Sequence, residues 1–92
     1  MKIVWRPLAV NDRAAIFGYI AQANPAAALA LDEQFDQQVN RAAQNPKLYK
    51  PGRVVGTREI VVRPNYILVY RADPETDTLT VVRVLHAAQQ WP

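Results

Sequence analysis

The chain has 92 residues, of which 50% are hydrophobic and 21% are charged, and its formal net charge is +3. This length and composition predict one globular domain over residues 1–92, with a slim stability margin in the absence of a partner. The lack of cysteine and serine excludes disulfides, thiolate metal sites and serine or cysteine nucleophiles, and the lack of a signal peptide or long apolar run predicts a cytoplasmic protein with no membrane contact.

The first elements predicted are a short strand and a helix. Lys2–Trp5 has the composition of a strand, and Pro7 ends it, because proline suits the first turn of a helix. The helix that follows places Ile16, Tyr19 and Ile20 on one apolar stripe, which we expect to face the core.

A second helix is predicted to follow directly. Asn24 is a suitable N-cap, Pro25 suits the first helical position, and the pattern continues to about Gln44. Its apolar stripe consists of Ala28, Leu31, Phe35, Val39 and Ala42. Its acidic residues are interpreted as a solvated face: Asp32, Glu33 and Asp36. The short link between the helices predicts an antiparallel hairpin.

The second half of the chain predicts a loop over 45–52, a strand stub at Val54-Val55, and then three strands. The strands are expected over 58–63, 66–72 and 78–85, with turns at Pro64-Asn65 and at 73–77. Asn65 is expected to take the left-handed conformation of the first turn, because asparagine tolerates it.

The middle strand is apolar on both faces, with Tyr66, Leu68 and Tyr70 on one side and Ile67 and Val69 on the other. A strand of this kind is central in its sheet. The predicted fold class is therefore α+β, in which an N-terminal strand and an antiparallel two-helix hairpin pack on a twisted, mainly antiparallel sheet.

Basic residues gather between positions 47 and 71, where only Glu59 is acidic. They are Lys47, Lys50, Arg53, Arg58, Arg63 and Arg71. A one-sided basic surface favours an acidic partner, either nucleic acid or protein, and a solvated sheet rim is the alternative interpretation.

Three residues near the C-terminus are further candidates. Arg83 is placed between Val81 and Leu85 on one strand face, where it serves recognition or forms a structural salt bridge, for example to Glu59. His86, the only histidine, is a structural residue or an acid–base group. Trp91 stacks on a base or anchors the C-terminus. No cofactor or metal motif is present, so none is expected.

Several motifs together resemble one family. They are Trp5, Ile16-x-x-Tyr19-Ile20, Asn24-Pro25-x-Ala27-Ala28, Pro51-Gly52-Arg53-Val54, Gly56-Thr57-Arg58-Glu59-Ile60-Val61, Pro64-Asn65-Tyr66-Ile67-Leu68-Val69-Tyr70-Arg71, and Arg83-Val84-Leu85-His86 with Trp91-Pro92. In order and spacing they resemble the ParE/RelE toxins of bacterial toxin–antitoxin pairs, over nearly the whole chain.

The resemblance implies the toxin of a type II toxin–antitoxin module, acting on one of two targets. ParE-like members are associated with inhibition of DNA gyrase, whereas RelE-like members resemble ribosome-dependent endoribonucleases that cut mRNA. Ile60 and Ile67 stand where the nucleases carry cations, which favours gyrase. The alternatives are the RelE-type nuclease, with Arg83 and His86 as catalytic candidates, and a stabilising module without toxicity.

The implied partner is a cognate antitoxin with an acidic segment, in a hetero-oligomer. The residues expected to bind it or the target are Arg53, Arg58, Arg63, Arg71, Arg83, His86 and Trp91. Many ParE-like chains carry arginines where this one has 87–90 as Ala-Ala-Gln-Gln, so its potency is open. We expect Arg83 and the tail to affect activity more than folding, and Trp5 and Phe35 to do the opposite.

Overall fold

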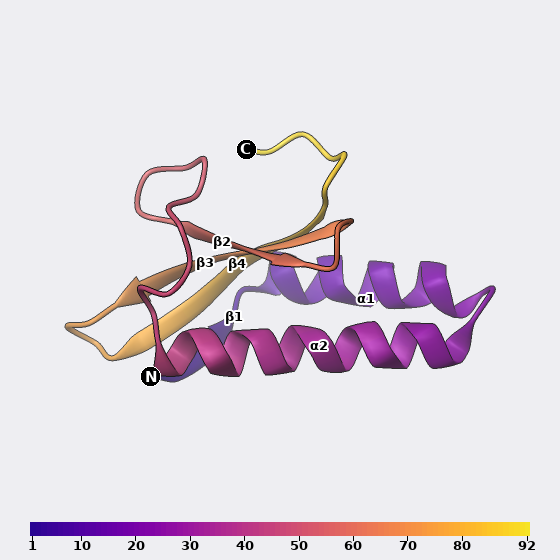
Figure 1. The fold of residues 1–92 in the computed structure, drawn as a ribbon, viewed down its shortest axis with the longest axis horizontal. Helices are drawn as coiled ribbons and strands as arrows, with labels where there is room; N and C mark the ends of the chain where they lie inside the picture. Colours follow the sequence, from indigo (N-terminus) through magenta and orange to yellow (C-terminus); the bar gives the residue numbers. More distant parts are fainter.

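The computed structural model describes residues 1–92 and contains two helices and one sheet of four strands (Figure 1). The elements are β1 (Lys2–Trp5), α1 (Pro7–Ala21), α2 (Pro25–Gln44), β2 (Arg58–Val62), β3 (Tyr66–Asp73) and β4 (Thr78–His86). The strand order is β1-β4-β3-β2, with β1 parallel to β4 and the other pairs antiparallel. The helical hairpin covers one face of the sheet, so the predicted α+β class is confirmed. Neither helix is long and apolar enough to cross a membrane.

The sequence specifies α2 well. The Asn24 side chain accepts a hydrogen bond from the Ala27 N–H at 3.0 Å, and Pro25 takes the first helical position. The whole predicted stripe is buried, and Phe35 at its centre is 1% exposed. The prediction for α2 is therefore confirmed at both ends and along its core face.

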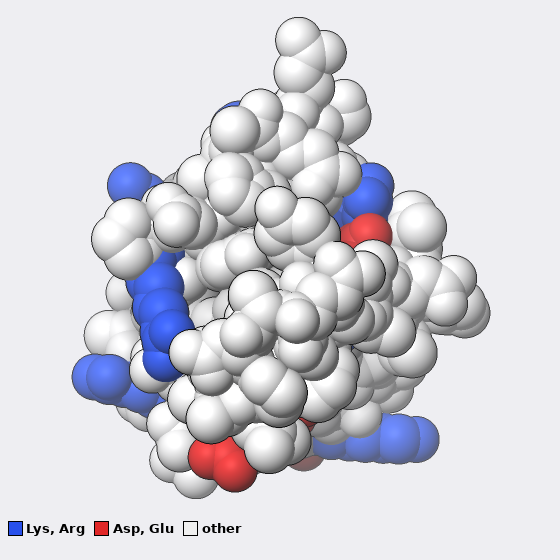
Figure 2. Space-filling view, turned by 90° about the vertical axis from the view of Figure 1, so that its right-hand side faces the viewer, with Lys and Arg blue, Asp and Glu red and all other residues white.

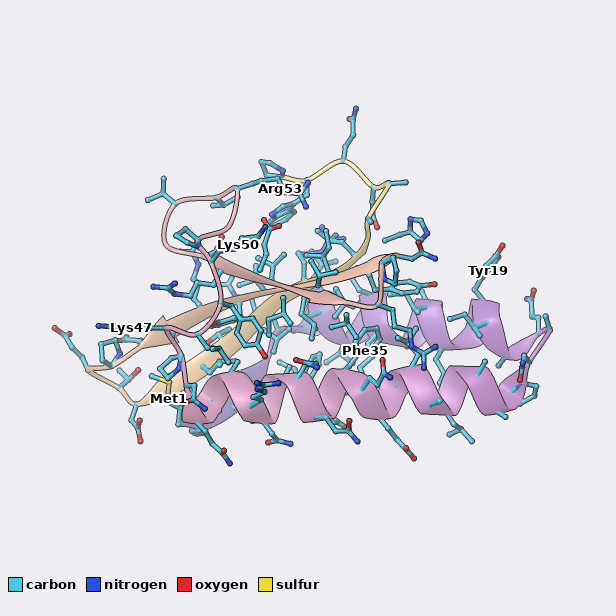
Figure 3. The ribbon with its side chains drawn as sticks, viewed as in Figure 1. Met1, Tyr19, Phe35, Lys47, Lys50 and Arg53 are labelled. Atoms are coloured by element: carbon cyan, nitrogen blue, oxygen red, sulfur yellow. The ribbon has the colours of Figure 1, made fainter.

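The prediction for α1 is right in its start at Pro7 and wrong in part of its stripe. Ile16 and Ile20 pack against the core, whereas the Tyr19 side chain is 76% exposed and points away from the hairpin (Figure 3). Tyr19 lies about 60° around the helix from Ile16. Because Ala9 is the only buried residue of α1, the contact face of this helix is narrow and excludes Tyr19.

Both loops of the second half differ from prediction at the level of single residues. The left-handed residue of the β2–β3 turn is Arg63, with φ 57°, and not Asn65. Pro64 is locked at negative φ, so the positive φ that the reversal needs falls on the residue before it. Val54-Val55 forms a turn and not a strand, because Gly56 at φ 83° reverses the chain there.

The register of β4 contains a bulge that changes the expected orientation of Arg83. Val69 of β3 pairs with Arg83, but its neighbour Tyr70 pairs with Val81, so Val82 is an extra residue. In an unbroken strand, Val81 and Arg83 would share a face. Because of the bulge, they lie on different faces.

The core lies on both faces of the sheet. The main cluster of 13 buried residues joins the sheet to the helices, and a smaller one, made of Val69, Val82 and Leu85, lies on the opposite face. The strand β3 contributes to both, which confirms that it is central.

Candidate functional site

The predicted binding residues do not form one site. Arg58 opens β2 and Arg63 follows its end, a separation of about 17 Å along the strand. Arg53 and Arg71 belong with Arg58 beside the loop over 45–57, whereas His86 ends β4 at the level of the β2–β3 turn. The seven residues thus divide between the two ends of the sheet, with Arg83 and Trp91 between them.

The loop before β2 is held to the sheet by three arginines. The Arg53 backbone N–H and Nε both donate to Glu59 Oε2, at 2.8 and 3.2 Å. Arg58 Nη1 donates to the Tyr49 carbonyl at 2.5 Å, and Arg71 Nη1 donates to the Val55 carbonyl at 3.3 Å. Each guanidinium has five N–H donors, so all three retain donors for a partner.

The surroundings of Glu59 lower its pKa. Burial raises the pKa of Glu59, but the hydrogen bonds and charge of Arg53, with the charge of Lys50, together lower it below its usual value. Arg53 is thereby neutralised locally, whereas Lys47 and Lys50 on the same loop are exposed (Figure 3). The free positive charge at this end therefore comes from the lysines, Arg58 and Arg71.

Arg83 forms an ion pair with Asp12 of α1 and not with Glu59. Its Nε and Nη2 donate to the Asp12 carboxylate at 2.7 and 3.0 Å, and these hydrogen bonds raise the pKa of Arg83. Glu59 lies at the same sheet level, but Val69 of β3 stands between them in the register, about 10 Å of sheet in all. The predicted Arg83–Glu59 pair is therefore wrong, although the structural salt-bridge interpretation is right.

Asp12 also completes the edge of β4. The strand β1 ends at Trp5, and Arg6 N–H donates to the Val81 carbonyl, so the edge of β4 that faces β1 has no strand neighbour beyond that point. The Asp12 carboxylate accepts the next free N–H, that of Val84, at 3.0 Å. One carboxylate thus fixes Arg83 and the strand edge together.

The C-terminal tail returns over the smaller cluster. Trp91 packs against it, the Arg83 guanidinium lies 5.6 Å from the ring centroid, and Trp91 Nε1 is buried without a partner. The exposed His86 accepts the Ala88 N–H at Nδ1 and meets Tyr66 edge to face. Trp91 therefore anchors the C-terminus, which is one of the two roles that the sequence analysis gave it. The structure holds no group of three or more potential His, Cys, Asp or Glu metal ligands.

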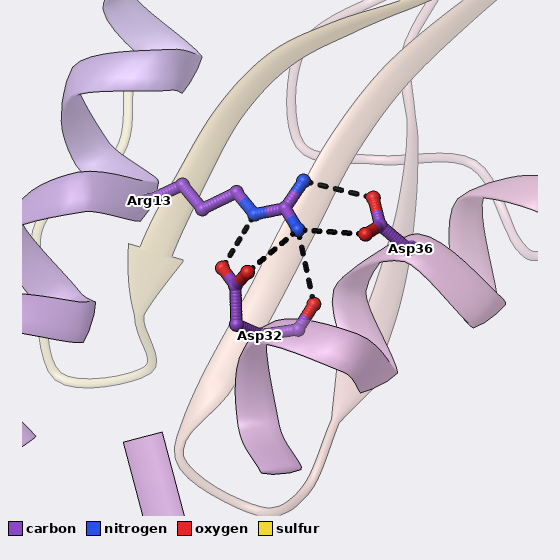
Figure 4. Close-up of polar contacts among 3 residues, drawn as sticks. All are labelled: Arg13, Asp32 and Asp36. Carbon is purple, nitrogen blue, oxygen red and sulfur yellow. Dashed lines mark hydrogen bonds and ion pairs between the residues drawn. The ribbon is translucent and has the colours of Figure 1, made fainter. Parts of the chain in front are cut away.

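One cluster was missed by the sequence analysis. Arg13 of α1 donates to Asp32 at 2.6 and 2.9 Å and to Asp36 at 2.9 Å from two nitrogens, as Figure 4 shows. The hydrogen bonds to Asp32 raise the pKa of Arg13 more than burial lowers it. The interpretation of the acidic residues of α2 as a solvated face is therefore wrong for Asp32; Asp36 is exposed but paired, and Glu33 is exposed as expected. The spacing of four residues between Asp32 and Asp36, facing the only cation within α1, is a signal that could have indicated the pair.

Comparisons with known proteins agree with this architecture. The family model for the ParE toxin of type II toxin–antitoxin systems, parDE, matches residues 3–91. A protein of Sinorhizobium fredii named "Putative toxin Y4kP" is 35% identical over 92 residues, covering 99% of this chain and 93% of that protein.

Solved structures show the same fold. The chromosomal ParDE system from P. aeruginosa contains a chain that is 20% identical and has a TM-score of 0.79, with 94% of this chain and 95% of that one covered. The RelBE2 toxin–antitoxin complex from Mycobacterium tuberculosis contains a chain that is 25% identical and has a TM-score of 0.61. The match covers 92% of this chain and 95% of that one. The family model and the S. fredii relative span nearly the whole chain, and the chain belongs to the ParE toxin family of type II toxin–antitoxin systems.

Proposed function

We propose that this toxin inhibits growth by binding and poisoning DNA gyrase in the cytoplasm, and that a cognate antitoxin neutralises it. The family supports the toxin–antitoxin pairing, because solved relatives include toxin–antitoxin complexes. The choice of gyrase over the ribosome rests on this chain's own residues.

One observation supports that choice: Arg83, one of the two candidate catalytic groups, is already engaged in an ion pair with Asp12. Cutting RNA by attack of a 2′-hydroxyl needs a base, an acid and a cation at the phosphate. Both Asp12 oxygens already accept hydrogen bonds from Arg83, and His86 Nδ1 is occupied by the Ala88 N–H. No second acid–base side chain bonds to His86.

Ile60 and Ile67 support the choice of gyrase over the ribosome to different degrees. Ile60 is 1% exposed within the main core, so its apolar character is explained by packing. Ile67 packs beside the smaller cluster on the other face and remains partly exposed, where a cation could reach solvent. The absence of a cation at Ile67 is therefore the stronger sequence argument against a nuclease.

For the antitoxin, we propose that an acidic segment binds beside the loop over 45–57. Lys47, Lys50, Arg58 and Arg71 leave positive charge there, because none of them pairs with a carboxylate. Charge-assisted hydrogen bonds from guanidinium groups to carboxylates are about twice as strong as neutral ones.

Two assays on purified protein separate the targets. In a supercoiling assay with gyrase and relaxed plasmid, we expect inhibition and accumulation of cleaved DNA. In primer extension on translating ribosomes, we expect no new mRNA ends. Codon-specific ends with unaffected supercoiling would overturn the proposal and turn attention to His86 and Arg83. Arginines introduced at Ala87 and Ala88 test whether the uncharged tail limits potency.

A further inference from the structure

The loop before β2 ends in a tight turn over residues 52–57, which projects on the face of the sheet that the helices leave uncovered (Figure 1). The Gly52 N–H donates to the Thr57 carbonyl at 2.8 Å, and the Thr57 N–H donates to the Val54 carbonyl at 3.0 Å. The Thr57 hydroxyl donates to the same Val54 carbonyl at 2.6 Å, and Thr57 is the only buried polar residue of the chain. The turn is therefore closed by its own hydrogen bonds.

The neighbouring strands hold this turn from outside. Glu59 accepts the Arg53 backbone N–H at 2.8 Å, and Arg71 Nη1 donates to the Val55 carbonyl at 3.3 Å. Gly56, at φ 83°, makes room for Arg71, because a Cβ at this position would lie 2.7 Å from Arg71 Nη1. A turn that is fixed before binding loses little conformational entropy when a partner binds it.

The tip of the turn presents one apolar side chain among cations. Val55 is 94% exposed, the largest exposed fraction among the large hydrophobic residues of the chain. A single exposed valine is ordinary, but this one lies at the end of a fixed turn and contributes nothing to the core. The cations of this end that pair with no carboxylate are Lys47, Lys50, Arg58 and Arg71.

The rest of the surface does not share this combination. The end formed by the α1–α2 turn is largely uncharged, as Figure 2 shows, and residues 14–31 contain no charged residue. The β3–β4 turn carries three acids and lies apart from the turn over 52–57, at the far left of Figure 1. A partner that fits the valine tip must offer several negative charges around an apolar contact. Duplex DNA does so, because phosphates border each groove and proteins insert apolar side chains between its base steps.

We propose that the turn over 52–57 contacts duplex DNA bound by gyrase, with Val55 in a groove and the four unpaired cations on phosphates at its borders. This rests on the proposed function and gives the toxin a direct contact with the DNA that gyrase holds. Valine offers no hydrogen bond to a base edge, so the contact is expected to show little sequence preference. The acidic segment of the antitoxin and the DNA phosphates compete for the same cations, which supplies a mechanism of neutralisation.

The test measures binding of the purified toxin to a fluorescein-labelled duplex of about 20 base pairs, by anisotropy, at several salt concentrations. Each phosphate contact contributes about −0.9 to the slope of log K against log salt, so four cations predict a slope of about −3.6. The affinity should therefore fall more than about a hundredfold between 50 and 200 mM salt.

Two pairs of exposed residues separate the cations from the tip. Lys50→Gln should make the slope less steep by about 1, whereas its control Arg6→Gln, which removes one charge at the opposite edge of the sheet, should leave the slope unchanged. Val55→Ser should weaken affinity about fivefold at every salt concentration with the slope unchanged, because an apolar contact releases no counterions. Its control is Val61→Ser on β2, where the valine is 59% exposed, and this variant should bind as wild type does.

The outcomes distinguish the inference from the proposed function. If Arg6→Gln changes the slope as much as Lys50→Gln does, the DNA is bound by net charge alone and the inference is overturned. A toxin that inhibits gyrase but does not bind the duplex also overturns it and leaves the proposed function intact. If Val55→Ser weakens binding to gyrase without DNA and leaves duplex affinity unchanged, the tip contacts protein and the inference is wrong. Duplex binding with the expected variant pattern but unaffected supercoiling supports the DNA contact and overturns the proposed function.

Discussion

Replacing Arg83 by alanine should destabilise this protein before it affects recognition. The guanidinium contributes two hydrogen bonds to Asp12, and the two side chains are only 20% and 13% exposed. Its removal leaves the Asp12 carboxylate mostly buried with a single donor, the Val84 N–H.

The magnitude follows from the environment of that carboxylate. Removing one partner of a fully buried pair costs about 3–5 kcal/mol. Water reaches this pair in part and Val84 still donates to Asp12, so we expect about 2 kcal/mol for Arg83→Ala. In a domain of this size that corresponds to a fall in melting temperature of about 8–16 °C.

Urea denaturation of four proteins measures the effect: wild type, Arg83→Ala, Asp12→Ala and the double variant. We expect a coupling free energy of about 1–2 kcal/mol between the two sites. Asp12→Asn is the control, because its amide oxygen can still accept from Val84 without the charge. Gyrase inhibition, measured at a temperature where Arg83→Ala remains folded, should stay near the wild-type level.

The opposite pattern would refute this reasoning. If Arg83→Ala melts within about 2 °C of wild type, a shift too small for a lost ion pair, and abolishes growth inhibition, then Arg83 acts in recognition. The expectation drawn from the sequence, that Arg83 affects activity more than folding, would then be correct.

Four further predictions concern other parts of the chain. Phe35→Ala should cost about 3–5 kcal/mol in urea denaturation, because Phe35 is fully buried, and Trp5→Ala should cost less, because Trp5 is half-buried beside an open groove; equal costs would contradict this. Glu59→Gln should reduce stability at neutral pH. The folded-state pKa of Glu59 is below the ordinary value of 4.5, so this difference should shrink as the pH falls below 4.5, and a difference independent of pH between 7 and about 2 would exclude the charge as its cause. Truncation after Leu85 should lower the melting temperature as well as toxicity, because it uncovers the cluster beneath Trp91, and an unchanged melting temperature would show that the tail has no structural role. Tyr70→Phe should cost about 0.5–1.5 kcal/mol, because it removes the hydrogen bond to the Pro46 carbonyl that holds the loop, and hydrogen exchange in that loop should rise; unchanged exchange would argue against this contact.

The sequence by itself determined the features that depend on neighbouring residues. The periodicity of α2, its Asn24-Pro25 start and the apolar faces of β3 predicted elements that the structure confirms almost to the residue. Local patterns are reliable there because a cap or an apolar stripe acts within a few residues of itself. The family was also readable, since its motifs keep a fixed order along the chain.

Only the tertiary structure decided which charges meet. Asp12 and Arg83 are 71 positions apart, and Arg13 and Asp32 are 19 apart, so the spacing within one helix or strand does not decide which partner each charge meets. The bulge at Val82 turned Arg83 away from its predicted face, and the strand length placed the other arginines at two ends of the sheet. Packing of α1 against one edge of β4 determined both the ion pair that orders this edge and the open groove beside Trp5. These outcomes depend on how whole elements pack against one another, which the order of residues within each element does not specify.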